Sequence, residues 1–297
     1  METRHAILRT LAGAVMISFS APLARIADTA PTVSGFYRML FGGLMLLALA
    51  LVRRKRLWAG PGPLLMALLV GFFFAWDLIF WHRSIRYVGP GLATILANFQ
   101  VFVLAAVGIW IYRERLRPRY ALALPLAMGG LWLLVGTDWA SLPDNYHFGV
   151  WMGLATAVAY SAYTLTLRKA QARPDAPPPE INLVFVCLLC AAVLAMSVLI
   201  EGSSFVIPNA KTWAALLTYG LVAQVLGWVL IARSLPYLNA SIAGMILLLQ
   251  PALSFTWDML FFNRPTTWVE LTGAALALAG IYLGATARRR EPARESP

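Results

Sequence analysis

Charged residues are scarce in this chain: Asp, Glu, Lys and Arg make up 12% of its 297 residues, whereas 60% are hydrophobic. Soluble domains carry about 25% charged residues. A water-soluble fold of this composition could not hide so much apolar surface. The scarcity therefore excludes an ordinary soluble domain and indicates that lipid surrounds most of the protein.

Acidic residues are the scarcer of the two charges, with 13 Asp and Glu against 24 Lys and Arg and a net charge of +11. A strong positive charge is also typical of nucleic-acid-binding proteins. Here, however, the basic residues form short clusters between long apolar runs, as they do in the loops of membrane proteins. The pattern favours a lipid bilayer as the partner and argues against nucleic acid.

Cysteines and catalytic motifs are few as well. Cys187 and Cys190 form a C-x-x-C inside an apolar run, where packing explains them better than redox chemistry. The sequence contains no Walker loop, no G-x-S-x-G and no H-E-x-x-H, and His82 near Asp77 has no further ligand at metal-binding spacing. We therefore expect no metal, no cofactor and no enzymatic activity, and an ATP-driven pump would need a soluble partner.

Long apolar runs are what the chain has in abundance. A transmembrane helix needs about 20 mostly apolar residues, and ten segments meet that length with short connections between them. The first begins with basic residues, as a signal peptide does, but it lacks a cleavage site, so we expect a retained helix. The predicted spans are 6–25, 33–52, 62–82, 90–112, 119–136, 148–168, 181–200, 211–231, 239–262 and 267–286.

Lys and Arg predict how these spans are oriented. With the N-terminus in the cytoplasm, 18 of the 24 basic residues fall on the cytoplasmic side, 5 fall outside and Arg38 lies within the second span. Such an excess marks the cytoplasmic face of a membrane protein. The sequence therefore predicts a multi-pass protein with both termini in the cytoplasm.

The chain repeats itself. The stretch "RSIRYVGPGLATILANFQ" at 83–100 and the stretch "RSLPYLNASIAGMILLLQ" at 233–250 share Arg, Ser, Tyr, Ala and the final Gln at a constant spacing of 150 residues. Gly130 and Gly280 match at the same spacing. Further matches at this spacing join Leu126 to Leu276, Ala127 to Ala277 and Leu133 to Leu283.

This duplication predicts the fold class. Each copy contains five spans, and because five is odd, the second copy must enter the membrane from the opposite side. We expect an all-α polytopic membrane protein of ten transmembrane helices, built as two inverted five-helix repeats at 1–140 and 141–297. Repeats of opposite topology can exchange conformations and so open a central site to each side in turn.

Three segments carry a resemblance to a known family. They are "FYRMLFGGL" early in the second span, "GPGLATILANFQVFVLAAVGIWIYRERL", in which Glu114 lies just past the fourth helix, and "LLLQPALSFTWDMLFF", with a Pro in the ninth span. In these the chain resembles the EamA-type exporters of the drug/metabolite transporter superfamily. One departure is that 263–265 read Asn-Arg-Pro where many members repeat a Gly-Glu pair, which makes Glu114 resemble a helix-end or gate charge.

The resemblance implies a function. Within the superfamily the sequence is most similar to exporters of aromatic amino acids. It implies a secondary transporter in a bacterial-type inner membrane that exports small amphipathic metabolites, amino acids with aromatic or other apolar side chains among them, by alternating access.

Polar and aromatic residues near mid-span are the candidates for contact with a substrate. Gln100 and Gln250 are equivalent by the repeat, and each amide can bind a carboxylate or an ammonium group. Asn98 neighbours Gln100 but falls on a different helical face. Bridging between helices remains the alternative role for such amides. The substrate-binding candidates are Gln100, Gln250, Gln224, Trp228, Tyr160 and Tyr163.

Arg38, Asp77 and Asp258 are ionisable residues within spans, where a charge is costly and expects a partner. All three fall in one zone near the outer ends of their predicted spans, with His82 close to Asp77. They form either an outer gate or proton relay, or an ion pair of Arg38 with Asp77 or Asp258 that holds helices together.

Two other functions stay open at this point. An intramembrane enzyme would use Asp77 and His82 for acid–base chemistry, and a sensor or assembly subunit would transport nothing. Inverted repeats favour transport over both. The Gly149-x-x-x-Gly153 and Gly280-x-x-x-Gly284 motifs permit close helix contacts, but packing within one chain accounts for them, so a monomer satisfies the sequence.

Overall fold

The computed structural model describes residues 2–111, 120–135, 143–238, 243, 246–247, 249–262 and 267–286. Every regular element within these residues is a helix, as the sequence predicts. Across this described part, seven helices are long and apolar enough to cross a membrane. They are Arg4–Ile26, Pro31–Val52, Pro61–Gly89, Leu92–Trp110, Asp144–Gln171, Pro179–Ile200 and Ala210–Tyr237.

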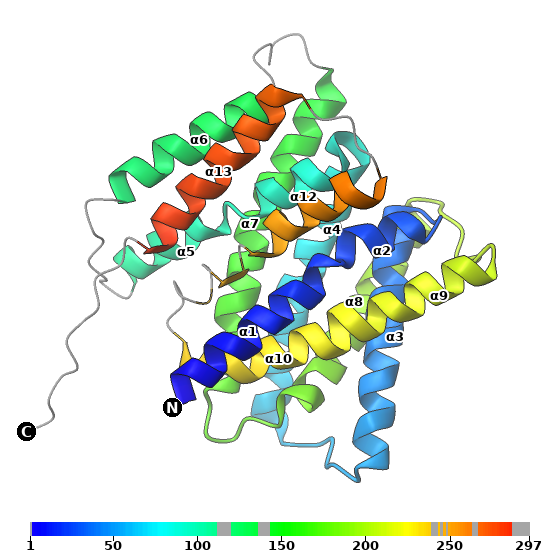
Figure 1. The fold of residues 1–297 in the computed structure, drawn as a ribbon. Coiled ribbons are helices and arrows are strands. Elements are labelled where there is room, and N and C mark those ends of the chain that lie inside the picture. Colours follow the sequence, from blue (N-terminus) through cyan, green and yellow to red (C-terminus); the bar gives the residue numbers. More distant parts are fainter. Residues whose placement is uncertain are drawn as a thin grey trace, which may run out of the picture.

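The helices follow one another with short connections (Figure 1). Three of the elements that correspond to predicted spans, α6, α12 and α13, are not among the seven long apolar helices. The first part of the chain forms α1 (Glu2–Ser18), α2 (Ser20–Ile26), α3 (Pro31–Val52), α4 (Pro61–Ala97), α5 (Gln100–Trp110) and α6 (Tyr120–Val135). The second forms α7 (Asp144–Gln171), α8 (Pro179–Ile200), α9 (Ala210–Tyr219), the π-helix η2 (Gly220–Gly227), α10 (Trp228–Ser234), the 3₁₀ turn η3 (Leu235–Tyr237), α12 (Leu249–Phe262) and α13 (Trp268–Thr286).

Helix α4 joins the predicted third span to the start of the fourth. Gly89 interrupts it with φ 80° and ψ 163°, a conformation that suits glycine, and the next residue, Pro90, has no N–H to continue the ladder. The straight part therefore runs from Pro61 to Gly89, which is longer than the predicted 62–82. Asp77 consequently lies near its middle and not near its end.

The segment α9–η2–α10 is one continuous rod with a π-helical centre, which sequence reasoning missed. Glycines begin and end the π-helix, and both meet another helix closely: a Cβ on Gly220 would approach the backbone nitrogen of Gly42 to 2.9 Å, and one on Gly227 would approach Ile17 to 2.7 Å. Short π-helical stretches inside α-helices occur frequently at functional sites.

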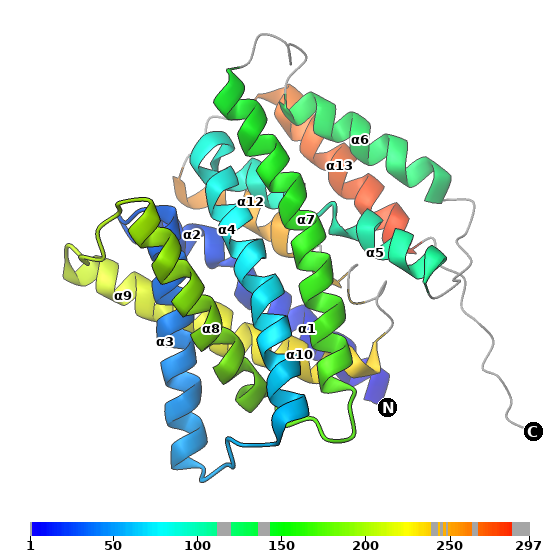
Figure 2. The same cartoon turned by 180° about the vertical axis from the view of Figure 1, so that it is seen from behind.

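Several helix contacts recur in both halves of the chain when the helices are matched in the order that the predicted repeat gives. The contact of α4 with α7 has its counterpart in the contact of η2 and α10 with α1. The contact of α4 with α8 has its counterpart in that of η2 with α3, and the contact of α5 with α7 has its counterpart in that of α12 with α1. The pairs α3 with α8 and α6 with α13 each join corresponding helices of the two halves. Figures 1 and 2 show α6 and α13 side by side at one edge of the molecule.

The α6–α13 contact is itself reciprocal. A Cβ on Gly130 would lie 2.2 Å from the backbone nitrogen of Ala277, and a Cβ on Gly280 would lie 2.4 Å from that of Ala127. The partner number falls as the residue number rises, so the two helices are antiparallel. We call these four residues the glycine seam; their glycines let the two backbones approach as closely as small residues permit in membrane helices.

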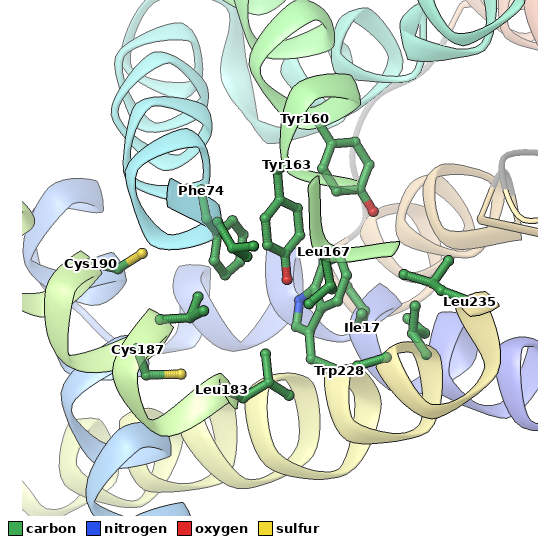
Figure 3. Packing of buried hydrophobic residues seen from close by; sticks show 14 of the residues in the cluster. Ile17, Phe74, Tyr160, Tyr163, Leu167, Leu183, Cys187, Cys190, Trp228 and Leu235 are labelled. Atoms are coloured by element: carbon green, nitrogen blue, oxygen red, sulfur yellow. The ribbon is translucent and has the colours of Figure 1, made fainter. Parts of the chain in front are cut away.

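The central core contains a cluster of aromatic rings among its aliphatic side chains (Figure 3). Phe74 on α4 stacks on Tyr163 of α7 with ring centres 4.2 Å apart, and Trp228 of α10 meets Tyr163 edge-on at 4.8 Å. Offset and edge-to-face ring pairs are the favourable arrangements. This core therefore ties α4 and α7 to α10 beneath the cavity described next.

Candidate functional site

A cavity of about 50 Å³ lies between the two halves of the chain. Both halves contribute to its wall, ten residues coming from the first and four from the second. The lining residues are Ile17, Ser20, Arg38, Phe74, Asp77, Leu78, Trp81, Thr94, Ala97, Asn98, Thr156, Tyr160, Trp228 and Gln250. We refer to it as the central cavity.

Arg38 forms part of the cavity wall and is only 4% exposed. Its Nε donates a hydrogen bond to Gln224 Oε1 at 3.3 Å, and Nη1 donates to the Tyr219 hydroxyl at 3.2 Å. The guanidinium carbon also lies 5.0 Å from the ring centre of Tyr219 and 5.8 Å from that of Phe74, within cation–π range. These contacts hold the guanidinium in one place.

Asp77 lines the same cavity and is 7% exposed. Among the described side chains no ion pair within 4 Å joins it to Arg38, so the predicted Arg38–Asp77 pair is not formed. The longer α4 places Asp77 near the middle of its helix and not near the predicted outer end, and Asp77 lines the cavity together with Gln250 and Tyr160. The side chain of Asp258 lies outside the described part.

Aromatic rings supply the apolar part of the wall. Phe74, Trp81, Tyr160 and Trp228 all line the cavity. Trp228 lies edge-on to Tyr160 with ring centres 6.1 Å apart. The Tyr160 hydroxyl and the Trp228 indole N–H are buried without a hydrogen-bond partner among the described residues.

The two repeated glutamines are not equivalent in the structure. Gln250 lines the central cavity, whereas Gln100 does not. The Gln100 amide lies close to the Tyr160 hydroxyl without the geometry of a hydrogen bond, and it is fully buried. Asn98, at the junction of α4 and α5, lines the cavity instead of Gln100.

The other predicted residues lie around the cavity and not on it. Gln224 holds Arg38 and donates from Nε2 to Cys187 Sγ at 3.2 Å, and Tyr163 supports Phe74 from behind. His82 is buried, its Nδ1 lies 2.6 Å from the carbonyl oxygen of Leu78, and its ring packs against Gly35.

His82 belongs to a second cavity, of about 490 Å³, at the far end of the straight part of α4. Arg83, Arg86 and Glu201 also line it. The wall is completed by Ala30, Pro31, Thr32, Tyr87, Phe148 and Ser203. Asp77 and His82 therefore face different cavities, and they do not form one acid–base pair.

Sequence reasoning missed Phe74 and Trp81 as lining residues, although a signal for them exists. Phe74, Asp77, Leu78 and Trp81 recur at the spacing of one helical face, and all four line the cavity. Starting from Asp77, helical periodicity alone could have found the other three. Ser20 and Thr94 carry no such signal.

Comparisons with known proteins agree with this architecture. The chain is 26% identical over 273 residues to the uncharacterized transporter YwfM of Bacillus subtilis, covering 90% of this chain and 88% of that protein. It is 25% identical over 214 residues to a probable amino-acid metabolite efflux pump of Salmonella typhimurium, covering 69% and 70% of the two. A crystal structure with 19% identity superposes with a TM-score of 0.71 over 94% of this chain and 95% of that one.

The family itself is found twice along the chain. The sequence profile of the EamA-like transporter family matches residues 4–136 and again residues 147–286. Together the two matches span most of the described helices of both halves. This chain therefore belongs to the EamA-like transporter family and is a helical membrane protein of that family.

Proposed function

We propose that the protein is a secondary transporter that exports small amphipathic metabolites across a bacterial inner membrane by alternating access. Amino acids with aromatic or other apolar side chains are the foremost substrates, which is what a resemblance to the aromatic amino-acid exporter YddG implies. The observation that carries the proposal is the central cavity, which joins a guanidinium group, a carboxyl group and aromatic rings between the two halves. The relative described as a probable amino-acid metabolite efflux pump supports it.

The helix contacts support two inverted five-helix repeats, residues 1–140 and 141–297. When each helix is replaced by its counterpart in the other half, the contact of α4 with α8 becomes that of η2 with α3, and the contact of α6 with α13 becomes itself. The glycine seam obeys the same exchange, since Gly130 meets Ala277 as Gly280 meets Ala127. Antiparallel reciprocity of this kind is what a two-fold axis in the membrane plane produces.

The size of the central cavity supports alternating access. Pockets that bind small molecules usually have about 300–1,000 Å³, whereas this one has about 50 Å³. An amino acid therefore enters only when the walls part. Alternating access requires such a change of the walls, because a site open to both sides at once would be a channel.

The distribution of basic residues supports the orientation, with both termini in the cytoplasm. Arg53, Arg54, Lys55 and Arg56 follow α3 directly. The second cavity, with His82 and Arg83, then opens toward the outside. In this orientation it is the route by which an exported molecule leaves.

An intramembrane enzyme is the less favoured function. It needs an acid and a base that face one substrate, but Asp77 lines the central cavity and His82 the second one. A sensor subunit has no need for a cavity that contains opposite charges. Transport is the function that uses all of these features, and a single chain suffices for it.

Purified protein in liposomes tests the proposal. Vesicles loaded with unlabelled phenylalanine are expected to take up labelled phenylalanine by counterflow, with the label recovered unchanged. Protein-free vesicles serve as the control. Recovery of a chemical product would support the enzyme, and the absence of counterflow across a panel of apolar and aromatic amino acids would refute the proposal.

A further inference from the structure

We propose that the central cavity recognises the zwitterionic head of a free α-amino acid, with Arg38 binding its carboxylate and Asp77 binding its ammonium group. The inference rests on the proposed function and narrows its substrate class. Amphipathic metabolites in general become molecules that carry both an unblocked carboxylate and an unblocked amine.

The side chains of Arg38 and Asp77 are buried, share one cavity and do not pair with each other. Arg38 and Asp77 both line the cavity, and no ion pair within 4 Å joins them. Glu180 provides the contrast, because this other buried carboxylate accepts a hydrogen bond from Arg233 at 3.1 Å. A buried charge expects such a counter-ion, and a zwitterion supplies one to Arg38 and one to Asp77 together.

Arg38 is prepared for a carboxylate. Its bonds to Gln224 and Tyr219 engage Nε and one N–H of Nη1, which leaves the other N–H groups of the planar fork without a protein partner among the described residues. That fork matches the two oxygens of a carboxylate. Gln224 is fixed in turn through Cys187, so the guanidinium needs little rearrangement when the ligand binds.

Acceptors are available for the ammonium group. The Asp77 carboxylate can accept two of its three N–H bonds, and Asn98 Oδ1 has no hydrogen-bond partner among the described residues although Asn98 lines the cavity. Phe74, Tyr160 and Trp228 form the wall against which an apolar or aromatic side chain would lie. An amine or a carboxylic acid alone would leave one of the two buried charges without a partner.

Blocked analogues of phenylalanine test this without any change to the protein. N-acetylphenylalanine lacks the ammonium charge and phenylalanine amide lacks the carboxylate. In counterflow with labelled phenylalanine we expect each analogue to compete at least about 30-fold more weakly than phenylalanine, since removal of one partner from a buried charge pair has that order of effect.

Two variants assign each charge to its residue. Asp77→Asn is expected to weaken competition by phenylalanine by a similar factor and to leave competition by N-acetylphenylalanine unchanged, so that the gap, the difference between phenylalanine and this analogue, disappears. Arg38→Gln is expected to remove only the gap between phenylalanine and its amide. Asp175→Asn is the matched control, because Asp175 is exposed and binds Arg173 by two hydrogen bonds of 2.8 Å outside the helices. It should retain both gaps.

The outcomes separate this inference from the proposed function. Wild-type protein that carries phenylalanine but accepts both blocked analogues equally well would overturn the zwitterion site and leave export of amphipathic molecules standing. Both gaps persisting in Asp77→Asn would also overturn it. Wild-type protein that carries no amino acid would refute the proposed function itself. The analogue series on wild-type protein decides the matter even if Arg38→Gln does not fold.

Discussion

The glycine seam predicts that two neighbouring glycines respond in opposite ways to the same substitution. A Cβ on Gly130 would lie 2.2 Å from the Ala277 nitrogen, whereas a Cβ on Gly129 would meet nothing within 4 Å. Carbon needs about 3.5 Å from such an atom. Gly130→Ala must therefore push α6 and α13 apart by about 1 Å, because backbone atoms of a helix cannot turn aside as a flexible side chain can.

The expected magnitude follows from two opposing effects. Alanine favours a helix by about 1 kcal/mol over glycine at either position, while overpacking of a tight contact costs about 1–3 kcal/mol and more against backbone. Gly129→Ala should thus be neutral or stabilising, and Gly130→Ala should destabilise by on the order of 1–2 kcal/mol. At about 2–4 °C per kcal/mol, the two variants should differ in melting temperature by several degrees.

Thermal melting in detergent, followed by the fluorescence of the 11 tryptophans, measures this difference. Gly280→Ala should behave like Gly130→Ala, since its Cβ would lie 2.4 Å from the Ala127 nitrogen. The double variant should cost less than the sum of both, because the first separation already makes room for the second methyl group. Equal melting of Gly129→Ala and Gly130→Ala would refute the seam, and with it the closest reciprocal contact between the halves.

Two further predictions concern the cavity and the orientation. Gln250→Leu should weaken phenylalanine binding about 5–30-fold, for one or more lost hydrogen bonds, at an unchanged melting temperature. Gln100→Leu should leave transport near normal, because Gln100 does not line the cavity. A loss of transport in Gln100→Leu alone would contradict this assignment of the lining residues. Asn145→Cys should react with an impermeant thiol reagent from outside, and Lys55→Cys should react only after permeabilisation. Labelling of the native cysteines should be low, because Cys187 and Cys190 are buried. The reverse pattern would overturn the predicted orientation.

Much of the fold could be predicted because lipid leaves few choices. Apolar runs of about 20 residues must be helices that satisfy their own hydrogen bonds, and the helices of the structure follow those runs. The repeat at a spacing of 150 residues matches Ala127 with Ala277 and Gly130 with Gly280. These are the four residues that meet in the glycine seam. Small residues align in sequence there because a close backbone contact tolerates nothing larger.

The interruptions could not be predicted to the residue. The kink at Gly89 and the π-helix from Gly220 to Gly227 each change the register of a regular helix. After the kink, Asn98 lines the cavity where Gln100 was expected. A pattern with a period of 3.6 residues carries no information about a register that the backbone itself changes.

The scarcity of charge that marks this sequence is also what gives its buried charges their meaning. A buried charge that only holds helices together needs a partner at contact distance, as Glu180 at the start of α8 has in Arg233. Arg38 and Asp77 lack that direct contact among the described side chains, yet both face one cavity. A pair held apart in this way costs more stability than a closed ion pair, and that cost is justified if a molecule with both charges bridges the gap during transport. If Arg38→Met combined with Asp77→Leu raised the melting temperature and abolished transport, the charges would serve function at the expense of stability; preserved transport in that double variant would contradict the argument.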